Sequence, residues 1–240
     1  MSQSERAPLP DIFGATVRGP GHVADQMPNQ DAWGHRRIGS LSIVVVSDGL
    51  GSRKYSREGS RAACESVVAA ARQWARFPAT TPDTFLGLIH LMWRARISPR
   101  LPSDCACTCL FAAVRPDGSG IVAQLGDGLI LMVDSGKITP LVIRADDDFA
   151  NETQALGMAK SLSSWKVLEL ESGTQSVILC TDGVADDLRH DRYGIFADWL
   201  CRDIRNTKPR ERSKTLAREL RAWPTPHHID DKTIAVVCME

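Results

Sequence analysis

Two eight-residue stretches match position for position: Ser42-Ile-Val-Val-Val-Ser-Asp48-Gly49 and Ser176-Val-Ile-Leu-Cys-Thr-Asp182-Gly183. Each contains four consecutive apolar residues, which is typical of a strand that is buried on both faces. Each ends in an aspartate and a glycine, and a glycine lets the backbone turn sharply or approach a ligand closely. The pattern predicts two rigid strands that each deliver one carboxylate to the end of a sheet, a placement that suits a functional site.

An Asp-Gly pair is also a common hairpin signal, and Asp117-Gly118 within Arg-Pro-Asp-Gly-Ser predicts such a turn. Asp48 and Asp182 differ, because neither is followed by a second alternating strand. A loop follows Asp48, and a helix-like stretch follows Asp182. A two-residue hairpin fits neither position, so we interpret both acids as functional.

Around these stretches, segments rich in Val, Ile and Leu predict further strands, and apolar residues at helical spacing predict two pairs of helices. The strands are expected at Ile12–Val17, Leu41–Ser47, Ala106–Val114, Gly120–Leu125, Leu129–Val133, Lys166–Leu170, Val177–Thr181 and Thr233–Cys238, and the helices at Ser56–Phe77, Thr84–Ile97, Tyr193–Arg205 and Arg210–Trp223. This order lacks the alternation of a doubly wound sheet and favours stacked sheets with helices outside, an α+β fold.

No long Gly/Ser- or Pro-rich linker and no repeat divides the sequence, so we expect one domain over residues 1–240, with residues 1–10 flexible. Lys plus Arg (29) balances Asp plus Glu (29), which argues against a general nucleic-acid binder or a polybasic membrane binder. No segment has the length and apolar character of a membrane span or a signal peptide.

The 7 cysteines are an odd number in apolar segments, which favours buried thiols in a reducing compartment, the cytoplasm. Cys105, Cys107 and Cys109 share one face of an expected strand, but no paired CxxC or histidine cluster supports a zinc site.

Further acids stand at the ends of expected elements: Asp31, Asp127 and the pair Asp230-Asp231. Sites made of oxygen ligands suit hard cations such as Mg²⁺ and Mn²⁺. Two such ions would polarise a phosphoryl oxygen and convert a bridging water into a hydroxide nucleophile. The chemistry that these acids predict is hydrolysis of a phosphate ester.

Six short motifs occur in an order that resembles the protein phosphatase 2C family of metal-dependent serine/threonine phosphatases, in its compact bacterial branch. They are Asn29-Gln-Asp-Ala32, Val46-Ser-Asp-Gly-Leu-Gly51, Cys107-Thr-Cys109, Leu125-Gly-Asp-Gly128, Cys180-Thr-Asp-Gly183 and Asp230-Asp-Lys-Thr233. The resemblance covers nearly the whole chain and implies a four-layer α-β-β-α sandwich with two central, mainly antiparallel sheets.

The resemblance also implies residue roles. Asp48 would bridge two catalytic Mg²⁺ or Mn²⁺ ions, with the Gly49 carbonyl on one of them. Asp182 and Asp230 would complete the ligands of the other ion, and Asp31 would orient metal-bound water. Asp127 and Asp186 match acids that hold a third, weaker ion in bacterial members.

Three positions depart from the family pattern. Gln30 stands where many members have a glutamate ligand, and we expect its amide oxygen to serve as a metal ligand there. Leu50 stands where some members have a histidine proposed as general acid. Gln26 stands at the spacing of the usual phosphate-binding arginine, which leaves His22, Arg18, Arg36 and Arg53 as substitutes.

Of these substitutes, His22 and Arg18 are the phosphate contacts that we predict, since Arg18-Gly-Pro-Gly-His22 resembles a Gly-x-x-His approach in this branch. A lone histidine carries little specificity, so a structural histidine is the competing interpretation. Asn151-Glu-Thr153 also resembles a motif of the branch, but helix capping explains it equally well.

The leading hypothesis is a cytoplasmic phosphoprotein phosphatase acting on phosphoserine and phosphothreonine, with a cognate serine/threonine kinase as partner. One rival is a catalytically weak module that binds a phosphoprotein or a kinase. Another is a hydrolase of small phosphorylated metabolites, because site chemistry alone does not name a substrate.

Overall fold

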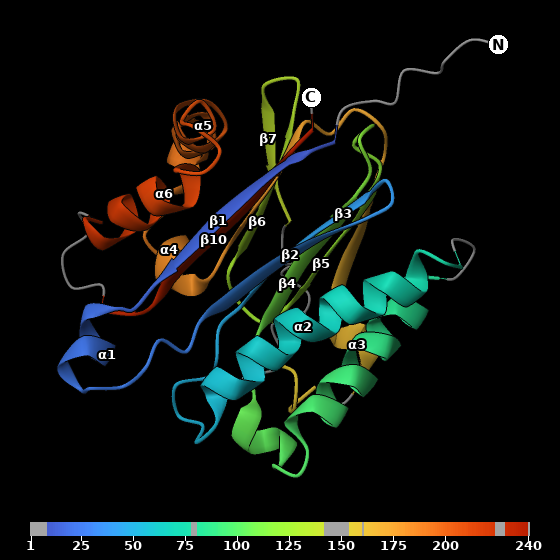
Figure 1. Ribbon diagram of the computed structural model, residues 1–240, viewed down its shortest axis with the longest axis vertical. Helices are drawn as coiled ribbons and strands as arrows, with labels where there is room; N and C mark the ends of the chain where they lie inside the picture. Colours follow the sequence, from blue (N-terminus) through green and yellow to red (C-terminus); the bar gives the residue numbers. More distant parts are fainter. Residues whose placement is uncertain (1–8, 78–80, 142–153, 160, 224–228, 240) are drawn as a thin grey trace.

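The computed structural model describes residues 9–77, 81–141, 154–159, 161–223 and 229–239. Two sheets lie face to face, and helices cover the outer face of each, so the order of layers is α-β-β-α (Figure 1). The expected fold class is confirmed. The expected flexible segment lies mostly, and Asn151–Thr153 entirely, outside the described residues.

One sheet carries the strand that ends just before Asp48. Its order is β2-β3-β4-β5-β8, and every neighbouring pair is antiparallel. The strands are β2 (Ala32–Ile38), β3 (Leu41–Ser47), β4 (Cys109–Val114), β5 (Gly120–Leu125) and β8 (Lys166–Leu170).

The other sheet carries the strand that ends before Asp182. Its order is β1-β10-β9-β6-β7, again antiparallel throughout. The strands are β1 (Asp11–Val17), β10 (Lys232–Cys238), β9 (Ser176–Cys180), β6 (Leu129–Asp134) and β7 (Lys137–Pro140).

Strand β3 explains why its sequence is apolar without alternation. Val44 and Val46 belong to the core between the two sheets, whereas Ile43 and Val45 pack under the helices on the outer face. All four side chains are 0% exposed. Burial on both faces fixes the strand that leads to Asp48.

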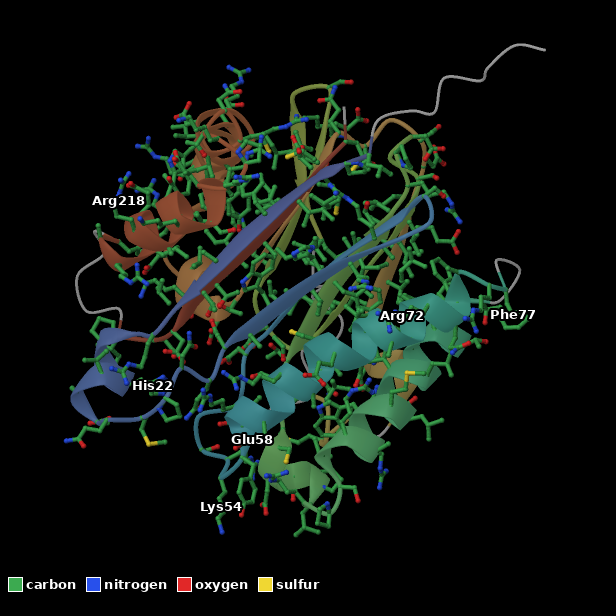
Figure 2. The ribbon with its side chains drawn as sticks, viewed as in Figure 1. His22, Lys54, Glu58, Arg72, Phe77 and Arg218 are labelled. Carbon is green, nitrogen blue, oxygen red and sulfur yellow. The ribbon has the colours of Figure 1, made fainter. Side chains whose placement is uncertain are left out.

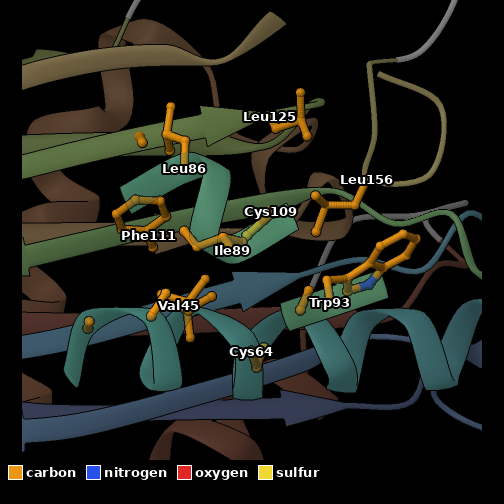
Figure 3. Packing of buried hydrophobic residues seen from close by; sticks show 14 of the residues in the cluster. Val45, Cys64, Leu86, Ile89, Trp93, Cys109, Phe111, Leu125 and Leu156 are labelled. Atoms are coloured by element: carbon orange, nitrogen blue, oxygen red, sulfur yellow. The ribbon is translucent and has the colours of Figure 1, made fainter. Parts of the chain in front are cut away.

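Helices α2 (Ser56–Trp74) and α3 (Pro82–Ile97) cover the β3 sheet. Figure 3 shows part of the core beneath them, where Phe111 and Cys109 of β4 lie among apolar side chains of both helices. The Phe85 ring stacks on Trp74 and contacts Phe111 edge to face. Two 3₁₀ turns, η1 (Pro102–Cys105) and η3 (Leu162–Ser164), complete this layer.

Shorter helices cover the β9 sheet. They are α4 (Asp182–Ala185), the 3₁₀ turn η4 (His190–Arg192), α5 (Tyr193–Asp198), the π-helical turn η5 (Trp199–Ile204) and α6 (Arg212–Arg221). Leu200, Leu216 and Leu220 anchor this layer on the sheet. The single helix expected at Tyr193–Arg205 is therefore α5 followed by η5.

The structure adds three elements that the sequence patterns did not predict: β2, β7 and the five-residue helix α1 (Pro20–Ala24). The strand expected at Ala106–Val114 begins only at Cys109, because Pro102–Cys105 forms a 3₁₀ turn and Cys107 makes only isolated bridges. Asp117-Gly118 forms the predicted turn, in which the Gly118 N–H donates to the Arg115 carbonyl at 3.0 Å. Among the described residues, no helix is long and apolar enough to span a membrane.

Candidate metal centre

The antiparallel topology gathers the predicted acids at one end of the sandwich. Because neighbouring strands run in opposite directions, the first residue of β2, Ala32, pairs with the last residue of β3, Ser47, which places Asp31 next to Asp48. Cys180 pairs with both Leu129 and Ile234. Asp127, Asp182 and Asp230, which lie just outside the paired residues of β6, β9 and β10, are therefore brought to the same end.

The backbone of Asp48 is fixed by Thr108, the residue between Cys107 and Cys109. The Asp48 N–H donates to Thr108 Oγ1 at 2.9 Å, and the Thr108 N–H donates to the Asp48 carbonyl at 2.8 Å. Thr108 is buried. These two hydrogen bonds fix the backbone of Asp48, and with it the position from which its carboxylate projects.

Both Asp-Gly pairs need their glycine for close approach of another segment. A Cβ on Gly49 would lie 2.6 Å from the Ser56 backbone at the start of α2. A Cβ on Gly183 would lie 1.8 Å from the Asp231 carbonyl oxygen. Any side chain at either position would push apart the segments that meet at the acids.

Asp31 is buried, at 5% exposure. Its Oδ2 accepts hydrogen bonds from Thr181 Oγ1 at 2.8 Å and Thr233 Oγ1 at 2.7 Å. Its other oxygen, Oδ1, is buried and has no hydrogen-bond partner among the described residues. An unpaired buried carboxylate oxygen is costly unless a cation or a water completes it.

The crowding of carboxylates changes their proton affinities. Burial raises the pKa of Asp31 to about 6, against the lowering effect of its hydrogen bonds. Burial, followed by the charges of Asp31 and Asp182, raises the pKa of Asp48 well above its usual value. Burial, with Asp127 and Asp230 next, raises the pKa of Asp182 to about 7.

The three raised pKa values have a common physical cause. Each carboxylate is taken out of water and placed near others, so the ionised forms repel each other and protons are retained. A divalent cation would remove that repulsion, and carboxylate and carbonyl oxygens are the ligands that hard cations prefer. Asp48, Gly49, Asp182 and Asp230 therefore fit the Mg²⁺ or Mn²⁺ ions that the acids predict.

Asp127 and Asp186 form the rim of this centre. Both side chains are exposed. Partial desolvation, followed by the charges of Asp186 and Asp230, raises the pKa of Asp127. The charges of Asp186 and Asp230 thus act on Asp127, but these three do not form a group, among the described residues, whose ligand atoms all lie within 4.8 Å of one another.

Asp231 has a role that the sequence reasoning missed. It is 1% exposed, and its carboxylate accepts the Gly19 N–H at 2.7 Å and the Gln30 N–H at 2.6 Å. His22 Nδ1 lies 2.8 Å from the same carboxylate. Asp231 therefore ties the start of β10 to α1, which carries His22 (Figure 2), and to the segment that leads to Asp31.

The Asp230-Asp231 dipeptide alone does not predict which of the two acids is buried. All three partners of Asp231 lie about two hundred residues earlier in the chain. His22, Asp230 and Asp231 each offer a ligand atom within 4.8 Å of the others. The histidine is thus part of this end of the molecule.

The side chain of Gln30 lies at the start of α2. The residue is 2% exposed, and its Oε1 accepts a hydrogen bond from Ser56 Oγ at 2.8 Å. Arg18 lies elsewhere: its side chain is exposed and donates to the Met27 carbonyl at 3.2 Å. No interaction among the described residues joins Arg18 to the acids.

The cysteines are packed in apolar surroundings, although Cys107 forms an isolated bridge with Gly49. Cys105, Cys107 and Cys109 are buried in the core between α2, α3 and the β3 sheet. Burial raises the pKa of Cys107 to about 12, so this thiol stays protonated near neutral pH.

The fold is a sandwich of two antiparallel sheets with outer helices, and it carries a cluster of carboxylates at one end. The sequence model of protein phosphatase 2C matches residues 18–221. The chain belongs to the protein phosphatase 2C family. A comparison with curated proteins found no match.

Solved structures share the fold at low sequence identity. MsPP from Mycobacterium smegmatis, a PPM Ser-Thr phosphatase in complex with cacodylate, is 19% identical with a TM-score of 0.63, over 98% of this chain and 100% of that one. Serine/threonine phosphatase Stp1 from Staphylococcus aureus is 16% identical with a TM-score of 0.65, over 100% and 99%. A C. elegans sex determining protein is 16% identical with a TM-score of 0.64; the match covers 99% of this chain but 66% of that one.

Proposed function

We propose that this protein is a Mg²⁺- or Mn²⁺-dependent phosphoprotein phosphatase that hydrolyses phosphoserine and phosphothreonine. Its family is one of phosphatases, and two proteins of the same fold are serine/threonine phosphatases. The observation that carries the proposal is the convergence of Asp31, Asp48, Asp182 and Asp230, with pKa values raised at the first three.

In this proposal Asp48, Asp182, Asp230 and the Gly49 carbonyl hold two cations, and Asp127 with Asp186 holds a weaker third. When bound, the cations would supply a Lewis acid for the phosphoryl group and an activated water. Asp31 orients that water, because its Oδ2 is occupied by two threonine hydroxyls and only Oδ1 remains available. The threonines thereby fix the direction in which Asp31 can accept a proton.

His22 is the phosphate contact that the geometry favours over Arg18. Its Nδ1 lies 2.8 Å from the Asp231 carboxylate, and we assign Nε2 as the nitrogen that contacts a phosphate oxygen. Arg18 would have to leave the Met27 carbonyl to take the same role.

Our proposal also covers the cellular compartment, the domain organisation and the partner of the protein. All 7 cysteines are free thiols, which supports a reducing compartment, the cytoplasm. We further propose a single phosphatase domain over residues 1–240 and a serine/threonine kinase that supplies the phosphorylated substrate.

The test is hydrolysis of p-nitrophenyl phosphate and of matched phosphoserine, phosphothreonine and phosphotyrosine peptides, with Mn²⁺ or with EDTA. We expect turnover that requires the metal and favours the phosphoserine and phosphothreonine peptides. Full activity after exhaustive EDTA treatment and dialysis would contradict the mechanism. Absence of turnover on every substrate at saturating Mn²⁺ would favour a binding module instead.

A further inference from the structure

A groove lies along the outer edge of β2, on the side of the molecule next to the metal centre. We call it the β2–α2 groove and define it by Gly34 and His35 of β2, Arg61, Val68 and Arg72 of α2, and Arg96 of α3. Its volume is about 560 Å³. The floor is open because Gly34 has no side chain, and a Cβ there would contact Cys64 at 3.4 Å.

Strand β2 is the edge of its sheet, so no strand in the described part of the chain pairs with one side of its backbone. An edge strand presents unpaired N–H and C=O groups that can pair with another extended chain. Trp33 of β2 packs inward against Gly14 of β1, where a Cβ would lie 2.8 Å from the indole ring. The strand is therefore held in place while its edge stays available.

Helix α2 presents one face to this edge. Arg61, Glu65, Val68 and Arg72 follow each other at intervals of three or four residues, which places them on one side of a helix. From Arg61 to Arg72 the helix rises about 16 Å, the length of about five residues of extended chain. Figure 2 shows Arg72 on α2, on the opposite side of the molecule from Arg218 of α6.

The groove is positively charged in a chain whose formal net charge is +0. Its one acid, Glu65, is paired with Arg96 at 3.4 Å. Arg61 and Arg72 form no ion pair with any residue in the described part of the chain. Arg36 and Arg37 extend the positive charge to the far end of β2, and both side chains are exposed.

The groove starts beside the metal centre. Strand β2 begins at Ala32, the residue after Asp31, and Ala32 pairs with Ser47, the residue before Asp48. Ala32 is also part of the groove lining. A chain with its phosphorylated residue at the acids can therefore continue along β2 without a gap.

We propose that the β2–α2 groove binds an acidic, extended segment of the phosphoprotein substrate next to its phosphorylated residue. The segment adds to the edge of β2 through its backbone, and its carboxylates meet Arg61 and Arg72. The inference rests on the proposed phosphatase function, which it narrows to substrates with acidic flanks. The neutral net charge of the whole protein favours a peptide over a nucleic acid as the occupant.

The experiment compares phosphoserine peptides with one common core, flanked on either side by five acidic residues or by five Asn and Gln residues. We expect kcat/KM to be about tenfold higher for one of the acidic peptides at low salt, and the preference to fade as salt screens the arginines. The double variant Arg61→Glu with Arg72→Glu should lose the preference but keep its turnover of p-nitrophenyl phosphate. The matched control is Arg210→Glu with Arg218→Glu, which makes the same charge change at exposed positions at and before α6 and should keep the preference.

Fluorescence anisotropy with a labelled, unphosphorylated acidic peptide separates the groove from the catalysis. We expect binding that weakens about tenfold or more in the Arg61/Arg72 variant, about 1.4 kcal/mol or more, and is unchanged in the control. If no phosphopeptide is hydrolysed, the phosphatase function fails, and this titration still decides the groove. Equal kcat/KM for acidic and neutral peptides, equal binding by both variants, or tighter Arg61- and Arg72-dependent binding of single-stranded DNA of equal charge would overturn the inference.

Discussion

Strand β2 joins two regions of opposite character. Before its first residue lies Asp31, buried among carboxylates whose charges are suppressed, and near its last residue lie Arg36 and Arg37, exposed to solvent. The acidic region is buried because four chain segments converge on it, whereas the basic region borders one edge strand and one helix face. The two regions therefore differ in depth as well as in sign: a buried cluster of acids suits metal ions, and exposed arginines suit an acidic partner.

Among the changes that separate the acidic region from the basic one, Asp48→Asn should have the largest effect on turnover. The substitution keeps the shape of the side chain but removes a ligand charge, so turnover of every substrate should fall by about a thousandfold or more. The matched control is Asp117→Asn, because Asp117-Gly118 is an exposed turn far from the acids in the fold and should leave turnover unchanged. Rates near those of the parent protein for Asp48→Asn, measured at saturating Mn²⁺, would show that the acids are not the catalytic region.

The acidic region was predictable from the sequence to a large extent. Asp48 and Asp182 follow strands that are buried along their whole length. This apolar pattern was strong enough to predict both the strands and the acids that follow them. Neither Asp231 nor Thr181 was recognised, since their roles depend on hydrogen bonds to Gln30 and Asp31, far away in the chain. Such contacts leave no periodic signal.

The basic region was not predictable in the same way. Strand β2 reads Ala-Trp-Gly-His-Arg-Arg-Ile, with a glycine in the middle and exposed arginines. It lies at the edge of its sheet and only Ala32 is buried, so it carries no run of apolar residues. Helix α1 and strand β7 are too short for a periodic pattern. The intrinsic propensity of the residues is a weak signal in such elements, so tertiary packing determines whether the elements form.

A smaller effect should follow from Gln30→Glu, which adds the carboxylate that the acidic region lacks at this position. Ser56 Oγ donates to Gln30 Oε1 and can donate equally to a glutamate, so the packing is preserved. Metal affinity depends on the charge of the ligands, so one cation should bind roughly tenfold more tightly, about 1.4 kcal/mol. The measurement is a Mn²⁺ titration of activity at one pH, checked by calorimetry.

Gln73→Glu is the matched control, since Gln73 is exposed on α2 and the substitution changes the net charge equally. It should not alter the half-saturating Mn²⁺ concentration. If Gln30→Glu leaves that concentration the same or raises it, Gln30 does not face the cations.

The smallest expected effect is the change with pH in the thermal stability of the metal-free protein. The pKa of Asp31 is raised from 3.8 to about 6 and that of Asp182 from 3.8 to about 7, so the folded state binds more protons than the unfolded state in this range. The stability that these protons supply is complete below about pH 4 and is lost as pH rises through about 6 to 7. The contribution of these acids to the Tm of the metal-free protein should therefore decrease from about pH 4 to about pH 7.

The measurement is thermal unfolding across this pH range for the parent protein and for Asp182→Asn, each with EDTA and with Mn²⁺. The substituted protein should lose part of the pH dependence, and Mn²⁺ should raise the Tm of the parent more at pH 7 than at pH 5. Identical pH dependence in the two metal-free proteins would contradict the assignment of the raised pKa to Asp182.

The most direct test of the central claim, that the converged carboxylates hold divalent cations, is an anomalous difference map from a crystal soaked in Mn²⁺. We predict two strong peaks in contact with the carboxylates of Asp48, Asp182 and Asp230, and a weaker third beside Asp127 and Asp186 at high Mn²⁺. Absence of density at Asp48 and Asp182, even at high Mn²⁺, would contradict the account.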